Sequence, residues 1–162
     1  MGAAIRQYEA KDFAALHKLD QACFPPGIAY SKFSLQYFLG LPAADCLVAE
    51  DAKPFATQGK PSGAQGKQIV GFILAETNPP LAHIITLDVA ESHRRAGLGS
   101  ALVAEMEKHF QFKQVRAVLL ETAVDNDTGI AFWKKHGYRE EAVLKRYYLG
   151  KVDAYEMRKR ME

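Results

Sequence analysis

The middle of the chain reads Arg94-Arg95-Ala96-Gly97-Leu98-Gly99-Ser100. This stretch follows a strand-like apolar run at residues 84–89 and opens a helix-like run at residues 98–110. A strand that turns through glycines into a helix leaves backbone N–H groups unpaired at the positive end of the helix. Such groups bind phosphate, because the amides donate and the missing Cβ atoms let the ligand approach closely. The stretch therefore predicts a phosphate-binding loop, although a short Gly-x-Gly also fits a plain turn.

Spacing separates this loop from two other phosphate loops. A dinucleotide-binding loop needs a third glycine three residues on, where this chain has Leu102, and it follows the first strand of the fold. A loop that ends in Gly-Lys-Ser/Thr is absent, since the Gly-Lys pairs at 59 and 66 are followed by Pro61 and Gln68. What remains is Arg-x-x-Gly-x-Gly after a strand in the middle of the chain.

Length and composition bound the possible functions. The chain has 162 residues, which suits one domain with one substantial core, and we expect a single domain over residues 1–162. A net charge of +2 without a dense basic face gives no indication of nucleic-acid binding. Two cysteines and five scattered histidines predict neither a disulfide framework nor a metal site. With no apolar run of membrane length and no leader, we expect a cytoplasmic protein that binds no membrane. The oligomeric state is not indicated.

Hydrophobic periodicity predicts alternating strands and helices. Strands are expected at residues 4–8, 46–51, 68–77, 84–89, 115–122, 138–149 and 153–159. Helices are expected at residues 11–23, 31–39, 98–110 and 127–136. Ser31 is placed to cap the second helix, and Asp125 or Asp127 to cap the fourth, which Gly137 closes. Residues 52–67 are rich in Gly, Pro, Gln and Lys and predict a long mobile hairpin loop.

This element order, with the Arg-x-x-Gly-x-Gly loop, resembles the GNAT N-acetyltransferase superfamily. The resemblance covers essentially the whole chain and is most specific from His83 onward. It implies an α/β fold with a mixed, mostly antiparallel seven-stranded sheet flanked by about four helices. Residues 120–126, together with Arg146-Tyr147-Tyr148 and Asp153-Ala154, resemble a narrower group. That group comprises the ribosomal-protein alanine N-acetyltransferases and related N-terminal protein acetyltransferases.

The resemblance implies that acetyl-coenzyme A (acetyl-CoA) binds along the central strand. Backbone groups of Leu87 and Val89 would hold its pantetheine arm. Asn126 would hydrogen-bond the same arm, although capping of the following helix is an equally good reading of this residue. The pyrophosphate would lie on the loop formed by Arg94, Arg95, Ala96, Gly97, Leu98, Gly99 and Ser100.

Two side chains are candidates for the chemistry. Glu121 ends an apolar strand, where a carboxylate is costly unless it faces a cleft. The resemblance makes it the general base that deprotonates the acceptor amine, while an ordinary ion pair at a strand end is the alternative. His83 falls where some N-terminal acetyltransferases have a tyrosine that assists deprotonation, and a histidine is suited to that work near neutral pH. A purely structural histidine is the alternative there.

The chain departs from the alanine N-acetyltransferases at Trp133. They place a tyrosine there, twelve residues after the glutamate, as the general acid for the departing thiolate. An indole N–H donates a hydrogen bond but supplies no proton near neutral pH. The proton would then come from water or from Tyr138, Tyr147 or Tyr148. Unassisted departure is also compatible with a thiol pKa near ~8.5.

The expected acceptor is the N-terminal α-amine of a protein or peptide. Phe24-Pro25 and the segment around Tyr30 resemble the peptide-contacting loop of N-terminal acetyltransferases, and they would face Tyr147 and Tyr148 across a slot. Adjacent strand residues point to opposite sides, so one of these two tyrosines is expected in the core and the other in the cleft. The alternatives are a GNAT enzyme that acetylates a small-molecule amine and a catalytically weak CoA-binding module.

Overall fold

The computed structural model describes residues 3–51 and 67–162. The long loop expected over residues 52–67 therefore lies, apart from Lys67, outside the described residues. The strands are β1 (Ala4–Gln7), β2 (Ala44–Asp51), β3 (Gln68–Asn78), β4 (Leu81–Val89), β5 (Ala117–Ala123), β6 (Arg139–Tyr148) and β7 (Val152–Arg160). The helices are α1 (Phe13–Cys23), α2 (Lys32–Leu39), α3 (Leu98–Phe112) and α4 (Asp127–Lys135), with short 3-10 turns η1 (Ala10–Asp12) and η2 (Glu91–His93).

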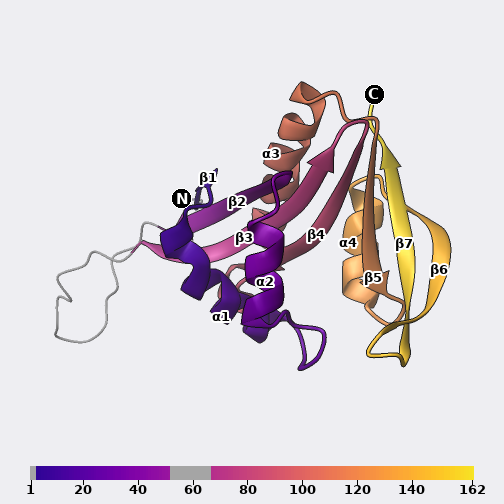
Figure 1. The fold of residues 1–162 in the computed structure, drawn as a ribbon, viewed down its shortest axis with the longest axis horizontal. Helices are drawn as coiled ribbons and strands as arrows, with labels where there is room; N and C mark the ends of the chain where they lie inside the picture. Colours follow the sequence, from indigo (N-terminus) through magenta and orange to yellow (C-terminus); the bar gives the residue numbers. More distant parts are fainter. Residues whose placement is uncertain (1–2, 52–66) are drawn as a thin grey trace.

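The strands form one seven-stranded sheet in the order β1-β2-β3-β4-β5-β7-β6 (Figure 1). The β4–β5 pair is parallel, and the other five pairs of neighbouring strands described are antiparallel. This confirms the predicted α/β fold and its mixed, mostly antiparallel sheet. None of the helices in the described ranges has both the length and the apolar character that crossing a bilayer requires.

Alternation along the strands divides the core between the two faces of the sheet. On β2 and β3, successive buried residues belong to two different clusters, as a period of two requires. One cluster packs the sheet against α3 and includes Leu47, Ala49, Ile73, Leu102 and Met106. The other packs it against α1 and α2 and includes Val48, Phe72, Leu74, Leu16 and Leu35. Helices α1 and α2 therefore cover one face and α3 the opposite face.

Several element boundaries differ from the sequence prediction, and two of these differences have a clear structural cause. The first helix is α-helical only from Phe13, because Glu9 and Asp12 cap each other and tighten the preceding turn into η1. The central strand starts at Leu81 instead of residue 84, because it pairs with Asn78 of β3 and with Ala117 of β5. Both differences arise from contacts that hydrophobic periodicity along the sequence does not predict.

Strands β4 and β5 separate along most of their length, and this separation positions the site. They pair only where Leu81–His83 meets residues 117–119, and beyond that point they diverge (Figure 1). On its other edge β4 stays paired with β3, with a bulge at Ile85 that the register skips. From Ile85 to Val89, the β4 edge that faces β5 is therefore outside any strand pair in the described sheet. This edge is available for hydrogen bonds to a bound ligand.

Candidate active site

Glu121 and His83 meet at the point where the two strands part. His83 is the Cα partner of Leu119, and Glu121 lies two residues further along β5 on the same face. The Nε2 atom of His83 lies 2.7 Å from Oε1 and 3.0 Å from Oε2 of Glu121. Because a carboxylate only accepts hydrogen bonds, His83 donates from Nε2. The structure thus joins the two residues that the sequence analysis proposed separately.

The contact also shifts the pKa of His83. Burial lowers the pKa of the imidazole, but the hydrogen bond and the charge of Glu121 outweigh burial and raise the pKa above its ordinary value. The Glu121 side chain is 16% exposed and that of His83 is 42% exposed, so solvent reaches the pair mainly at the histidine. A partly exposed carboxylate–imidazole pair of this kind can accept a proton.

Tyr147 on β6 is a third member of this group. Its hydroxyl donates a 3.1 Å hydrogen bond to Oε1 of Glu121. Burial first, and then the charge and hydrogen bond of Glu121, raise the pKa of Tyr147 to about 12. The hydroxyl therefore keeps its proton near neutral pH and holds the carboxylate in place.

The prediction that Tyr147 and Tyr148 face opposite sides of the strand is wrong. Their rings are in edge contact, with centroids 4.9 Å apart, and the pKa values of both hydroxyls are raised by burial and by the charge of Glu121. The register of β6 is irregular between Leu144 and Tyr148, and Arg146 takes a left-handed φ of 54°. This interruption breaks the alternation on which the prediction relied.

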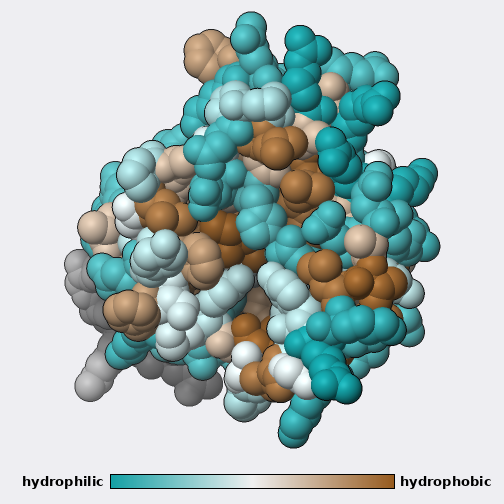
Figure 2. Space-filling model, turned by 45° about the vertical axis from the view of Figure 1, so that its right-hand side comes forward, coloured by the Kyte–Doolittle hydropathy of each residue, from teal (hydrophilic) through white to brown (hydrophobic). Residues whose placement is uncertain are grey.

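The α1–α2 segment and the β6–β7 turn meet at the open end of the two strands. A Cβ atom added to Gly27 would lie 2.6 Å from Cδ2 of Leu149, so the Leu149 side chain packs directly on the backbone of Gly27. Tyr30 packs its ring edge-on to Phe38, and its hydroxyl lies 3.5 Å from the carbonyl oxygen of Ile85. Figure 2 shows this side of the molecule, where apolar side chains form several patches among hydrophilic ones. The two predicted acceptor segments thus contact each other beyond the point where the β4–β5 pairing ends.

Phe24 and Pro25 continue the α1–α2 segment. Phe24 is half-buried directly after α1, while Pro25 is exposed and its carbonyl oxygen accepts hydrogen bonds from Ile28 and Ala29. Their contact with an acceptor stays a prediction.

The N-terminus of α3 fits a phosphate group. Arg95 and Gly97 have left-handed φ values of 64° and 83°, and no side chain in the described ranges caps the helix at Gly97. A Cβ atom added to Gly97 would meet no atom within 4 Å, so the space above the first turn is open. The backbone N–H groups of Leu98, Gly99 and Ser100 begin the helix and point toward its positive end. Together with the β4 edge at Leu87 and Val89, this turn has the donors that a pantetheine diphosphate needs.

Several predicted cofactor residues also make contacts within the protein. Arg94 turns back from the loop, because its Nε donates to the carbonyl oxygen of Val89 at 3.0 Å. The Ser100 hydroxyl is 2.9 Å from Nε2 of His136, which leaves its backbone N–H as the group available to a ligand.

Asn126 is the N-cap of α4. Its Oδ1 atom accepts a 3.0 Å hydrogen bond from the N–H of Gly129, so the capping reading of this residue is confirmed. The expectation of Asp125 or Asp127 as the cap was wrong, because Asp127 is already the first helical residue and Asp125 precedes the cap. The side-chain amide of Asn126 still carries two N–H donors, so its contact with the cofactor stays a prediction.

Trp133 and Tyr138 lie away from the opening. Trp133 is in the core cluster with α3 and contacts the rings of Phe132 and Tyr138 edge-on. The Tyr138 hydroxyl donates to Glu107 on α3 at 3.1 Å, and burial raises its pKa far above the ordinary value. Of the tyrosines considered as proton donors to the leaving thiolate, Tyr147 and Tyr148 are the two that lie near Glu121.

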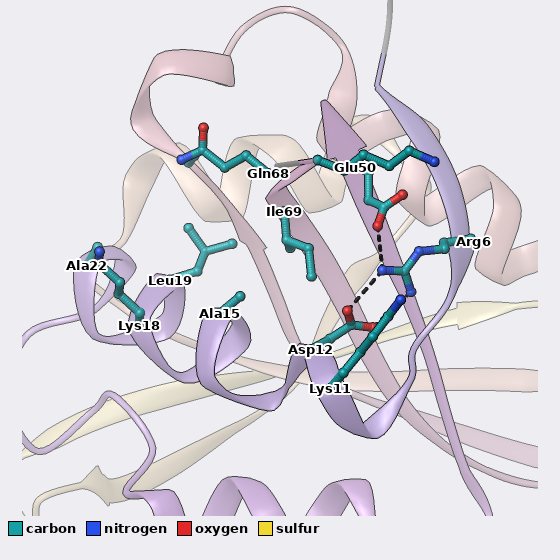
Figure 3. A pocket seen from close by; sticks show the side chains of 12 residues that line it. Arg6, Lys11, Asp12, Ala15, Lys18, Leu19, Ala22, Glu50, Gln68 and Ile69 are labelled. Carbon is teal, nitrogen blue, oxygen red and sulfur yellow. Dashed lines mark hydrogen bonds and ion pairs between the residues drawn. The ribbon is translucent and has the colours of Figure 1, made fainter. Parts of the chain in front are cut away.

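A surface cavity of about 750 Å³ lies elsewhere, between α1 and the ends of β2 and β3 (Figure 3). Its arginine, Arg6, donates to both Asp12 and Glu50, and hydrogen bonds with these carboxylates raise its pKa. Because its charge is compensated and no predicted site residue is among the described residues that line it, this cavity is not the candidate active site.

The chain belongs to the Acetyltransferase (GNAT) family, which matches residues 13–138. It is similar to an N-alpha-acetyltransferase of Sulfurisphaera tokodaii, with 38% identity over 76 residues that make up 46% of each protein. In its matches to such archaeal relatives, the chain spans about half of the relative's length. It is also 27% identical over 164 residues to the catalytic subunit of the N-terminal acetyltransferase A complex of Arabidopsis thaliana, covering 98% of the chain and 78% of that protein.

Solved structures agree with the fold. Ard1 from Thermoplasma volcanium superposes with a TM-score of 0.81 at 25% identity, covering 100% of this chain and 99% of that one. The NatC complex bound to Gag peptide and CoA contains a chain that matches with a TM-score of 0.80 at 22% identity, with full coverage of both chains. These comparisons confirm the family and the fold that the sequence predicted.

Proposed function

We propose that this protein transfers the acetyl group of acetyl-CoA directly to the N-terminal α-amine of a protein or peptide. The observation that carries the proposal is the Glu121 carboxylate, held by His83 and Tyr147 at the opening between β4 and β5. The names of the relatives support an α-amine as acceptor. The contact of the Leu149 side chain with Gly27 supports a joint role of the α1–α2 segment and the β6–β7 turn in acceptor binding.

The site residues have separate tasks in this reaction. The β4 edge at Leu87 and Val89 would hold the pantetheine arm, and the α3 N-terminus would hold the pyrophosphate. Acetyl-CoA supplies the acetyl group as a thioester and carries away the sulfur. The Glu121–His83 pair would accept the proton that the attacking amine loses. A backbone N–H of β4 near Leu87 would face the thioester oxygen as negative charge develops on it.

An α-amine suits this proton acceptor better than a lysine side chain does. The α-amine has a pKa of ~7.7–8.0, so an appreciable fraction is neutral at pH 7, whereas a lysine amine near ~10.4 is almost entirely charged. Less free energy is therefore needed to transfer a proton from the α-amine to the carboxylate–imidazole pair than from a lysine amine. This difference favours N-terminal acetylation over lysine acetylation.

Rates of CoA release with matched substrates test the proposal. Peptides with free N-termini and varied first residues are compared with the same peptides N-blocked but containing lysine, and with spermidine. We expect release above the acetyl-CoA hydrolysis background only with free N-termini. Release only with spermidine would move the protein to the small-amine class. If no acceptor causes CoA release although CoA binds tightly, the protein is a CoA-binding module without acetyltransferase activity.

Tyr147→Phe tests the tyrosine that holds the carboxylate. The change keeps the ring and removes one hydrogen bond to Glu121, and at this half-exposed position we expect a loss of about 1 kcal/mol, or roughly fivefold in kcat/KM. CoA affinity should stay at the wild-type value. Tyr37→Phe is the matched control, because Tyr37 is exposed on α2 and contacts Phe38. Equal kinetics of the two variants would mean that the Tyr147 hydroxyl does not assist Glu121.

A further inference from the structure

Two buried carboxyl groups lie against each other beneath the proposed acceptor site. Asp20 on α1 is 0% exposed and Asp88 on β4 is 1% exposed. Burying one charged carboxylate is costly, and burying two side by side is costlier still. Neither residue has a task in the proposed reaction, so their presence in the core needs another explanation.

Each carboxyl group uses one oxygen for a hydrogen bond from the protein. The hydroxyl of Thr86 donates to Oδ1 of Asp88 at 2.6 Å, and the N–H of Tyr30 donates to Oδ2 of Asp20 at 2.6 Å. The other two oxygens, Oδ1 of Asp20 and Oδ2 of Asp88, receive no donor from the described residues. The two carboxyl groups face each other within reach of a mutual hydrogen bond. Since a carboxylate has no proton to donate, that hydrogen bond needs one proton on the pair.

The other charged and titratable groups around the pair do not compensate a second negative charge on it. Burial first, and then the hydrogen bond and charge of Asp20, raise the pKa of Asp88 well above its ordinary value. Arg94 acts in the opposite direction but does not outweigh them. The thiols of Cys23 and Cys46 also face Asp88, and burial raises both of their pKa values, so they are neutral.

The pair connects two parts of the proposed site. Asp20 holds the backbone of Tyr30, whose hydroxyl lies 3.5 Å from the carbonyl oxygen of Ile85 in the β4 bulge. Asp88 lies between Leu87 and Val89, the two residues proposed to hold pantetheine. A hydrogen bond between the carboxyl groups therefore ties the α1–α2 segment to the strand that carries the cofactor.

We propose that Asp20 and Asp88 share a single proton and that, in this state, they are positioning residues that hold the Tyr30 segment against β4 for acceptor binding. The positioning role rests on the proposed function, whereas the shared proton does not. Loss of the proton at high pH leaves two facing carboxylates, which repel each other and release the segment.

The sign of the pH effect on stability follows from the raised pKa. The folded protein holds a proton on Asp88 that the unfolded chain loses near the ordinary value of 3.8. The stabilisation is therefore fully present below that value and is lost as pH rises through the raised pKa of the folded state. Asp88→Asn removes this dependence, because its amide nitrogen donates to Asp20 at every pH while its oxygen still accepts from Thr86.

Urea unfolding of wild type and of Asp88→Asn at a series of pH values tests the shared proton. Groups other than the pair titrate alike in both proteins, so their effects cancel in the comparison. We expect the folded-to-unfolded ratio of wild type, relative to Asp88→Asn, to fall by up to ~tenfold for each pH unit within the window. A ratio that stays constant from pH 4 to pH 10 would overturn the proposal, whether or not the protein acetylates any peptide.

Peptide kinetics test the positioning role. Asp20→Ala removes the acceptor for the Tyr30 N–H, and we expect about a tenfold higher KM for peptide with CoA affinity unchanged. Asp20→Asn retains an acceptor and a donor and should restore the wild-type KM, now without a rise at alkaline pH. If Asp20→Ala does not fold, the positioning role is tested by comparing the pH dependence of the peptide KM between Asp20→Asn and wild type. Identical KM profiles of Asp20→Asn and wild type up to pH 10 would refute the role.

Discussion

Replacing Glu121 with glutamine lowers kcat for peptide acetylation by about 10²–10⁴-fold, the range typical of losing a general base. The amide keeps the shape of the side chain but does not take up the proton that the amine loses. CoA affinity should remain at the wild-type value, because Glu121 lies on β5 and the proposed cofactor contacts lie on β4 and α3. Steady-state kinetics with calorimetry of CoA binding measures both quantities.

The acidic limb of the rate–pH profile gives this prediction a second readout. In wild type, Glu121 holds the pKa of His83 above 6.5, so the limb lies above the ordinary histidine value. In Glu121→Gln the raising charge is gone while burial remains, so residual activity should show a limb at lower pH. Glu140→Gln is the matched control, because that residue forms an ion pair with Lys134 at the opposite end of β6 from Tyr147. If Glu121→Gln has the wild-type kcat, the Glu121 carboxylate is not the general base and has only a structural role.

Replacing Gly97 with valine should weaken CoA binding by about 10–100-fold. The change puts a β-branched side chain into the open space above the first turn of α3, where the pyrophosphate is proposed to lie. Loss of one hydrogen bond to a charged group costs about 1.5–3 kcal/mol, which gives this range. Desulfo-CoA should show the same loss, because the thiol takes no part in the contact.

Gly150→Val is the matched control for backbone strain. Gly150 also has a left-handed φ, of 64°, and open space around its Cα, but it lies in the turn between β6 and β7. Both variants should lose a similar amount of stability, and only Gly97→Val should lose CoA affinity. Calorimetry that shows equal CoA affinity for the two folded variants would remove the phosphate assignment.

The fold was predictable because its signals are local. The glycine loop, the Ser31 cap, the Gly137 end of the fourth helix and the period-two runs all appear where the sequence placed them. The face of Tyr148 was not predictable in the same way, because the left-handed Arg146 interrupts β6 at a residue that is not glycine. The hydrophobic periodicity of residues 139–148 does not indicate a left-handed residue at Arg146.

For the candidate site, the sequence indicates residues but not the contacts between them. Glu121 and His83 were each identifiable, but their hydrogen bond depends on the three-residue pairing of β4 with β5. Asp20 and Asp88 were missed, although both carry a signal. Asp20 lies one turn after Leu16 on the apolar face of its helix, and Asp88 occupies a buried position in the alternation of its strand. A carboxylate in an apolar position, found in two segments, indicates a buried acid pair.

The most direct test of N-terminal acetyl transfer is the position of the acetyl group on a peptide with one free α-amine and one internal lysine. The peptide is incubated with acetyl-CoA and the protein, and the product is fragmented in a tandem mass spectrometer. We expect the added acetyl mass on the N-terminal fragments, an unmodified lysine, and about 10²–10⁴-fold slower product formation with Glu121→Gln. Acetyl mass on the lysine with a free N-terminus would contradict the proposed function.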